Sequence, residues 1–135
     1  MSDRDETIKH ILRETKTIAV IGMTSRKSRA GHYVPAYLQQ AGYRIIPVNP
    51  YEEEILGEKA YPDLHSVPEP VDLALLFRRP ESVPPHVEEA IETGVDAVWM
   101  QLGIVNEEAA ERARAAGLDV VMDACMMVEH RRRMG

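Results

Sequence analysis

The sequence predicts an α/β fold: a doubly wound, parallel five-stranded sheet with helices on both faces, in three layers. The first observation is a set of five short apolar runs along the 135 residues, covering residues 17–21, 43–48, 71–77, 95–100 and 118–122. Continuous apolar runs of this length are typical of strands buried on both faces, as in parallel sheets. The second observation is that helical stretches separate most of these runs, which indicates parallel pairing through right-handed crossovers.

Four stretches have the spacing and the end signals of helices. Apolar residues recur at helical spacing in the first of them, behind an acidic first turn. Gly42, Gly94 and Gly117 follow the next three stretches, where a glycine suits the C-terminal cap. Asn106 is a good N-cap and is followed by two glutamates. We therefore expect helices over residues 3–14, 33–41, 84–93 and 107–116.

The connection over residues 49–71 is unusual because it lacks a full crossover helix. Pro62, Pro68 and Pro70 in it predict a loop with about one helical turn near Leu64. We favour the Rossmann-like strand order 3-2-1-4-5, with strands numbered along the chain. The flavodoxin-like order 2-1-3-4-5 is the alternative, and hydrophobic periodicity does not separate the two.

Composition excludes several classes of protein. Hydrophobic residues make up 44% and charged residues 28%, as in globular proteins, and the length suits one domain over residues 1–135. The net charge of −6 and the 5% of aromatic residues argue against a nucleic-acid partner. No apolar run could span a membrane, and the first six residues lack signal-peptide features, so we expect a cytoplasmic protein. The single cysteine excludes an internal disulfide framework.

Charge is unevenly distributed along the chain. Residues 15–51 contain no Asp or Glu and carry five cations, so this segment is +5 and the remainder is −11. The cations are Lys16, Arg26, Lys27, Arg29 and Arg44. A local cationic zone on an acidic protein favours a small anionic ligand, and chance clustering of solvated side chains is the alternative.

The segment after the first strand is the main candidate for a binding site. Ligands of open parallel sheets bind beyond the carboxyl ends of the strands, at the point where the strand order reverses. Residues 22–31 follow the first strand there and combine hydroxyls, three cations and a helix N-terminus, which suits a phosphate group. The segment matches neither G-x-G-x-x-G nor the P-loop pattern, so a polar turn without a ligand is the alternative.

The exits of the other strands refine this prediction. Asn49 and Pro50 follow the second strand, where NAD-binding sites usually have an acid for the ribose, so NAD is disfavoured. Arg78 and Arg79 follow the third strand and could pair with phosphates or with surface acids. Gly103, after the fourth strand, permits a close backbone approach, whereas Trp99 is expected in the core.

Several strings of the sequence, in order, resemble a known family. GYRIIPVNP, FRRP and MQLGI each follow a predicted strand, and the likeness runs from Thr17 to about Arg131. The chain resembles the small, single-domain CoA-binding proteins, which share their fold with the CoA-binding domain of the succinyl-CoA synthetase α subunit. This resemblance implies a Rossmann-like domain whose ligand is coenzyme A or an acyl-CoA. The family's contact positions correspond to Gly22, Met23, Thr24, Ser25, Lys27, Asn49, Pro50, Phe77, Arg78, Pro80, Val83, Gln101 and Gly103.

CoA also suits the residues themselves. Its pyrophosphate and 3′-phosphate need several cations and no ribose-binding acid, and the cations available are Arg26, Lys27, Arg29, Arg78 and Arg79. The 2′-phosphate of NADP would need similar cations. The pantetheine arm of CoA is expected near Met23, Val83 and Leu102.

The chain departs from the family pattern at two places. Ala124 stands where relatives often have arginine, so a contact made by that arginine is absent. Ala30 and Gly31 replace a common proline and serine, which leaves the loop less fixed. The phosphohistidine of the synthetase belongs to a further domain, so no ligase activity follows from the resemblance.

No residue set predicts catalysis or a metal site. The five histidines share no metal-ligand spacing. Cys125 is expected to be a half-buried structural cysteine, with a nucleophilic or redox role as the alternative. The basic tail at residues 130–133 predicts a solvated helix end.

Three hypotheses of function remain at this point. The first is a non-enzymatic module that binds CoA or acyl-CoA through its ADP part. The second is an NAD(P)-binding enzyme or redox sensor, and the third is an interaction protein that has lost its ligand. A small-molecule nucleotide is the partner we expect, with no nucleic acid and no membrane, while nothing in the sequence identifies a protein partner.

Overall fold

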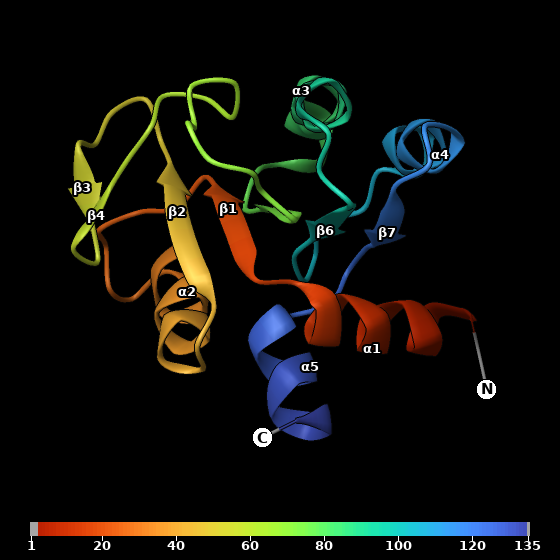
Figure 1. Ribbon diagram of the computed structural model, residues 1–135, viewed down its shortest axis with the longest axis horizontal. Coiled ribbons are helices and arrows are strands. Elements are labelled where there is room, and N and C mark those ends of the chain that lie inside the picture. Colours follow the sequence, from red (N-terminus) through yellow and green to blue (C-terminus); the bar gives the residue numbers. More distant parts are fainter. Residues whose placement is uncertain (1–2, 135) are drawn as a thin grey trace.

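The computed structural model describes residues 3–134, which form one five-stranded parallel sheet between two layers of helices (Figure 1). The predicted helices and strands are all present, with ends shifted by up to three residues. The elements are α1 (Asp3–Glu14), β1 (Thr17–Ile21), α2 (Ala30–Gln40), β2 (Arg44–Val48), β3 (Glu54–Ile55), β4 (Glu58–Lys59), β5 (Leu73–Leu76), α3 (Val83–Thr93), β6 (Ala97–Met100), α4 (Glu107–Ala115), β7 (Asp119–Val121) and α5 (Met126–Arg133).

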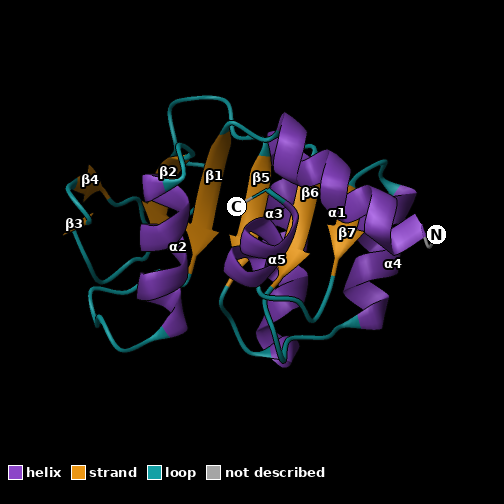
Figure 2. Cartoon of the chain, turned by 90° about the horizontal axis from the view of Figure 1, so that it is seen from below, coloured by secondary structure: helices purple, strands orange, loops and turns teal. Residues whose placement is uncertain are grey.

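Alternate residues of the strands build two separate cores. Ile18 and Val20 of β1 face the core that α1, α2 and α5 cover. Ala19 and Ile21 face the opposite core, under α3 and α4. Figure 2 shows α1, α2 and α5 lying across one face of the sheet, so the doubly wound three-layer prediction is confirmed. Trp99 is fully buried in the first core, as expected, and its indole N–H donates to the Ala124 carbonyl at 2.9 Å.

The order of the strands is β2-β1-β5-β6-β7, which is 2-1-3-4-5 for the five predicted strands. The favoured order 3-2-1-4-5 is therefore wrong and the flavodoxin-like alternative is observed. Pro47 supplies the physical reason, because a residue without an N–H is confined to an edge strand. Its carbonyl points away from β1 and accepts a hydrogen bond from the Tyr61 N–H at 3.0 Å, so β2 is the edge of the main sheet.

The connection between β2 and β5 contains more structure than the sequence predicts. Two antiparallel two-residue strands, β3 and β4, form a hairpin beside β2 (Figure 1). Near Leu64 the chain makes a hydrogen-bonded turn, in which the Val67 N–H donates to the Leu64 carbonyl, and not a turn of helix. The Leu64 side chain is buried and anchors this connection to the core under α3.

An ion pair joins the C-terminal helix α5 to the N-terminal helix α1. The Arg133 guanidinium contacts Asp5 of α1 at 2.6 Å and Glu129 at 3.0 Å, and 17% of its side chain is exposed. Its hydrogen bond to Asp5 lowers the pKa of that carboxyl. Arg131 and Arg132 are exposed, as a solvated helix end predicts, but Arg133 is not, because it holds α5 against α1. None of the described helices is long and apolar enough to cross a membrane.

The ends of β1 and β5 approach one another closely. Gly22 has φ +89°, and a Cβ added there would lie 2.4 Å from the Phe77 carbonyl oxygen. The Phe77 N–H donates to the Ile21 carbonyl at 2.8 Å, which keeps the two strand ends together. A side chain at residue 22 would push them apart.

We predict that Gly22→Ala lowers the free energy of unfolding by about 3 kcal/mol, because strain from a positive φ adds to a backbone clash. Gly57→Ala is the matched control, since Gly57 has φ +76° and nothing within 4 Å of an added Cβ. The control should lose only about 1 kcal/mol. Urea unfolding measures both variants, and equal losses would contradict the close approach of Gly22 to Phe77.

Candidate functional site

The carboxyl ends of β1 and β5 form the point where the strand order reverses. The chain leaves β1 toward α2 on one face of the sheet and leaves β5 toward α3 on the other. The two connections diverge and leave a cleft between them, where open α/β sheets bind ligands. The sequence places the site beside the first strand. In the observed order the other side of the site is formed by β5, the third predicted strand, whereas the favoured order would have placed the fourth predicted strand there.

Two cavities open at this point. The larger, which we call the main cavity, has a volume of about 640 Å³ and the smaller, the side cavity, about 230 Å³. Gly22 and Arg78 line both of them. The main cavity is also lined by Thr24, Arg26, Arg29, Ala30, Gly31, Tyr33, Phe77, Arg79, Gln101, Leu102, Ile104 and Cys125. The side cavity is also lined by Ile21, Val48, Asn49, Pro50, Tyr51, Pro62, Asp63, His86 and Glu89.

Four exposed arginines line the main cavity, namely Arg26, Arg29, Arg78 and Arg79, and a fifth exposed cation, Lys27, belongs to the same loop as Arg26 and Arg29. Within residues 3–134, none of them lies within ion-pair distance of a carboxylate. The other cations of the acid-free segment are elsewhere, since Lys16 and Arg44 lie at the amino ends of β1 and β2. Arg44 is paired with Glu58 and Glu69. Only part of the cationic segment therefore serves the cleft, and Arg78 and Arg79 complete the set.

The loop between β1 and α2 is held by its own hydrogen bonds. The Thr24 N–H donates to the Gly31 carbonyl at 3.2 Å, and the Arg29 N–H donates to the Arg26 carbonyl at 3.0 Å. A ring nitrogen of His32 contacts the Thr24 carbonyl at 2.8 Å. Gly31 lets α2 approach closely, since a Cβ there would lie 3.0 Å from the Gly22 carbonyl oxygen. The loop with Ala30 and Gly31 is thus well connected, although we expected its conformation to be less fixed.

Asn49 ties the exit of β2 to this loop. Its amide nitrogen donates to the Met23 carbonyl at 2.8 Å, and its amide oxygen accepts from the Tyr51 N–H at 2.8 Å. The side chain therefore fixes both the turn and the neighbouring loop while it lines the side cavity. Pro50 lies beside it in the same wall.

A carboxylate from the β2–β3 connection enters the loop. Glu52 accepts the Ser25 N–H at 3.0 Å. Ser25 and Lys27 do not line either cavity, although they belong to the loop. A backbone N–H beside three cations is a favourable position for an anion, so the Glu52 carboxylate stands where a ligand phosphate could be held.

The remaining predicted contact residues divide into cleft residues and core residues. Phe77, Arg78 and Gln101 line the main cavity, and the Gln101 oxygen accepts the Met126 N–H at 2.9 Å. Met23 and Val83 are fully buried, one in each core. Because both side chains are buried, a ligand that passes these two residues would meet their backbone groups, and the expectation of a pantetheine arm near them stays a prediction.

Two further predicted residues lie outside the lining of both cavities. The Pro80 carbonyl accepts a hydrogen bond from the Asn106 amide nitrogen at 2.9 Å. The Gly103 N–H donates to the Asp123 carboxylate at 2.7 Å. Both groups hold neighbouring loops in place.

Sequence reasoning missed several lining residues, and His86 is the most informative. It is the fourth residue of α3, eight residues after Arg78. Burial, and then the nearby Arg78 charge, lower the pKa of His86, while Glu89 acts in the opposite direction. Tyr33, Tyr51 and Ile104 were also missed. The sequence contained one signal that could have identified these residues: each follows the carboxyl end of a predicted strand by no more than about twelve residues.

Two other features bear on chemistry. Cys125 is half-buried, as expected, but it also lines the main cavity just before α5. Asp63, His65 and Glu89 bring metal-ligating atoms within 4.8 Å of one another near the side cavity. Both ring nitrogens of His65 contact carboxylates, that of Glu89 at 2.9 Å and that of Glu92 at 3.0 Å, so the polar atoms of this histidine already have partners.

Comparison with known proteins places this geometry in a family. The sequence pattern of the CoA binding domain matches residues 16–131. YneT of Bacillus subtilis is 45% identical over 123 residues, which are 91% of each chain. A hypothetical protein from Pyrococcus horikoshii OT3 has a similar structure, with a TM-score of 0.93, 40% identity and coverage of 97% of this chain and 92% of that one.

A larger relative links the domain to an enzyme class. ADP-forming acetate–CoA ligase I of Archaeoglobus fulgidus is 31% identical over 121 residues. The match covers 82% of this chain but 18% of the ligase, so it concerns one part of that enzyme. The resemblance detected in the sequence is confirmed: this chain belongs to the CoA-binding domain family.

Proposed function

We propose that the protein binds coenzyme A or an acyl-CoA in the cleft between β1 and β5 and acts as a non-catalytic binding or sensing module. The observation that carries this proposal is the group of four lining arginines, with Lys27 on the same loop, none of which has a carboxylate partner within residues 3–134. CoA carries a pyrophosphate and a 3′-phosphate, which need several cations close together. Arginine suits this role because its planar group donates two parallel hydrogen bonds to a phosphate.

The rest of the cleft supports a ligand with an apolar arm. Leu102, Ile104 and Tyr33 line the main cavity, and 67% of Leu102 is exposed. An exposed leucine beside a cationic pocket offers apolar surface to a ligand whose other end is charged. We expect the predicted contact residues that line the cleft to touch the ligand through side chains, and Met23 and Val83 to contribute only backbone groups.

Another cavity of the protein fits this ligand less well. It lies at β7, between α1 and α4, and has a volume of about 830 Å³. Its charged lining residues are two arginines and four acids, namely Arg4, Arg114, Asp3, Glu107, Asp119 and Asp123. A polyphosphate would meet net negative charge there, so size alone does not favour this cavity.

NADP is the second candidate ligand. The cations that suit the 3′-phosphate of CoA would also suit a 2′-phosphate, and Asn49 stands where an NAD site usually has an acid. The family assignment favours CoA. Ligase activity of the larger relatives is not part of the proposal, and a cytoplasmic location and a one-domain organisation stay predictions.

Identification of the bound nucleotide tests the proposal. The purified protein is denatured, and the released small molecules are identified by mass spectrometry. In parallel, its melting temperature is measured with CoA, NAD and NADP, because a ligand that prefers the folded state raises stability. We expect CoA or an acyl-CoA to be released and CoA to raise the melting temperature most. Release of NADP, with a shift by NADP alone, would replace the proposal by the second candidate.

Arg78 should contribute most to affinity, because it lines both cavities. We predict that Arg78→Ala weakens CoA binding by about 10- to 100-fold, the loss typical of a charge-assisted contact. Lys27→Ala, outside the lining, should cost less. Arg13→Ala on α1 is the matched control and should leave affinity unchanged. Isothermal titration calorimetry measures all three, and an unchanged affinity of the Arg78 variant would show that this cation does not hold the ligand.

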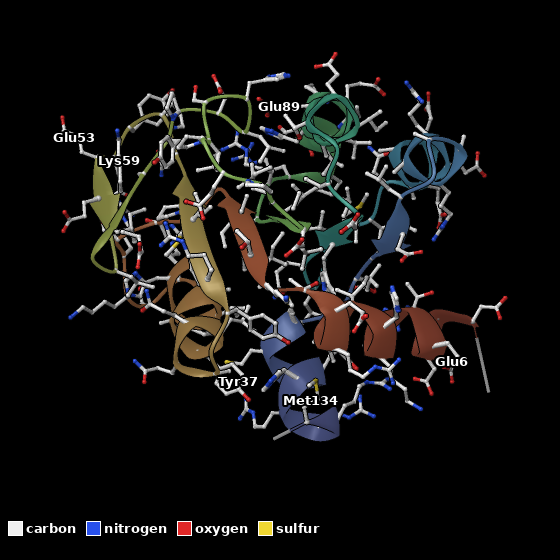
Figure 3. The ribbon with its side chains drawn as sticks, in the orientation of Figure 1. Glu6, Tyr37, Glu53, Lys59, Glu89 and Met134 are labelled. Carbon is white, nitrogen blue, oxygen red and sulfur yellow. The ribbon has the colours of Figure 1, made fainter. Side chains whose placement is uncertain are left out.

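Glu52 should oppose the ligand, because its carboxylate occupies the Ser25 N–H. We predict that Glu52→Gln tightens CoA binding by about three- to tenfold, since a neutral amide competes less well with a phosphate. Glu53→Gln is the control, because Glu53 is exposed at the hairpin (Figure 3) and makes no side-chain contact with the loop. Weaker binding by the Glu52 variant would mean that the carboxylate shapes the site and does not compete for it.

A further inference from the structure

His86 is a half-buried imidazole at the side cavity, on the first turns of α3. Within residues 3–134, its ring nitrogens make no hydrogen bond and no ion pair. The histidine is thus held at the cleft by the backbone of α3, with its polar atoms free to meet a ligand.

Charged groups reach the same cavity from three elements. Arg78 comes from the exit of β5, Glu89 from α3 one turn after His86, and Asp63 from the loop after β4. Glu89 lies on the side of α3 that faces this loop (Figure 3). The Glu89 carboxylate is already engaged, because it accepts the His65 backbone N–H and contacts the His65 ring at 2.9 Å. The Asp63 carboxylate is engaged as well, because it accepts the Ser66 N–H at 2.8 Å and the Ser66 hydroxyl at 2.7 Å. Tyr51 is the other titratable group of the lining.

In the free protein, burial and the positive charge of Arg78 lower the pKa of His86 below its ordinary value of 6.5. The imidazole is therefore mainly neutral at pH 7. A phosphate group beside Arg78 would reverse this balance, because it offsets the arginine charge and offers an anionic acceptor. The imidazolium form then becomes the better partner, since it donates from both nitrogens.

We propose that His86 is a phosphate-binding residue of the side cavity and that it takes up a proton when a phosphate group of CoA enters. This inference rests on the proposed function and deepens it, because it makes CoA affinity depend on pH through one side chain. Neither the family resemblance nor the sequence motifs assign a role to this histidine.

The direction of the effect follows from the two states of the protein. Above the pKa that His86 has in the complex, both states carry a neutral imidazole and affinity is lowest. Between that value and the lower pKa of the free protein, binding takes up a proton and affinity rises as pH falls. Below the lower value both states are charged and affinity no longer changes through this group. Each unit between the two pKa values corresponds to about a tenfold change in affinity.

The test is isothermal titration calorimetry of CoA with the wild type, His86→Gln and a control, His10→Gln, at pH 8.5, 7.5 and 6.5. His10 is exposed on α1, so the control removes one imidazole away from the cleft. Each titration is run in two buffers of different ionisation enthalpy, which gives the number of protons taken up. Circular dichroism establishes that the variants fold. The phosphate of CoA itself gains protons near pH 6, so the quantity compared is the difference between each variant and the wild type.

We compare the affinity of the wild type, divided by that of His86→Gln, at the two extremes of pH. We expect this ratio to be about three- to tenfold larger at pH 6.5 than at pH 8.5, and the ratio for His10→Gln to behave in the same way. We expect proton uptake in the first two proteins and its loss in the third. The titrations are repeated with dephospho-CoA, which lacks the 3′-phosphate. If the difference between the wild type and His86→Gln persists, the partner of His86 is the pyrophosphate; if the difference disappears, the partner is the 3′-phosphate. Equal pH dependence and equal proton uptake in all three proteins would overturn the role of His86 while CoA binding stands. Failure of all three to bind CoA would overturn the proposed function as well.

Discussion

The close contact between the ends of β1 and β5 is the constraint on which the site depends. Gly22 leaves no room for a side chain against the Phe77 carbonyl, so the two strand ends stay side by side. From this pair, one connection rises to α2 and the other to α3, on opposite faces of the sheet. Arginines that are about fifty residues apart in sequence, such as Arg26 and Arg78, are thereby brought to one cleft.

The cleft is positively charged on a protein whose net charge is −6. Elsewhere in residues 3–134, five of the eleven other cations have carboxylate partners, namely Lys9, Arg44, Arg112, Arg132 and Arg133. The cations of the cleft have none within residues 3–134, and solvent and salt screen the repulsion among them in the free protein. A polyphosphate bound as we propose would relieve that repulsion and would accept hydrogen bonds from the backbone N–H groups of the loop. In the free protein the Glu52 carboxylate accepts one of these N–H groups, that of Ser25.

Local patterns predicted most of the fold, because periodicity and end signals act within one element. Asn106 caps α4 through the Ala109 N–H at 2.9 Å, as its position before two glutamates indicates. The strand order was predicted wrongly although Pro47 contained the needed signal, since a proline marks an edge strand. Contacts between distant segments could not be predicted: Arg133 with Asp5 joins the two ends of the chain, and Glu52 with Ser25 joins two loops. His86 was missed because helical spacing does not tell which side chain a neighbouring arginine will face.

A crystal structure of the protein with CoA tests the central claim most directly. The account predicts that the phosphates of CoA lie between residues 22–29 and Arg78, that the Glu52 carboxylate has left the Ser25 N–H, and that the pantetheine arm follows Leu102 into the main cavity. CoA bound in the groove between α1 and α4, with the arginines of the cleft still in solvent, would contradict it.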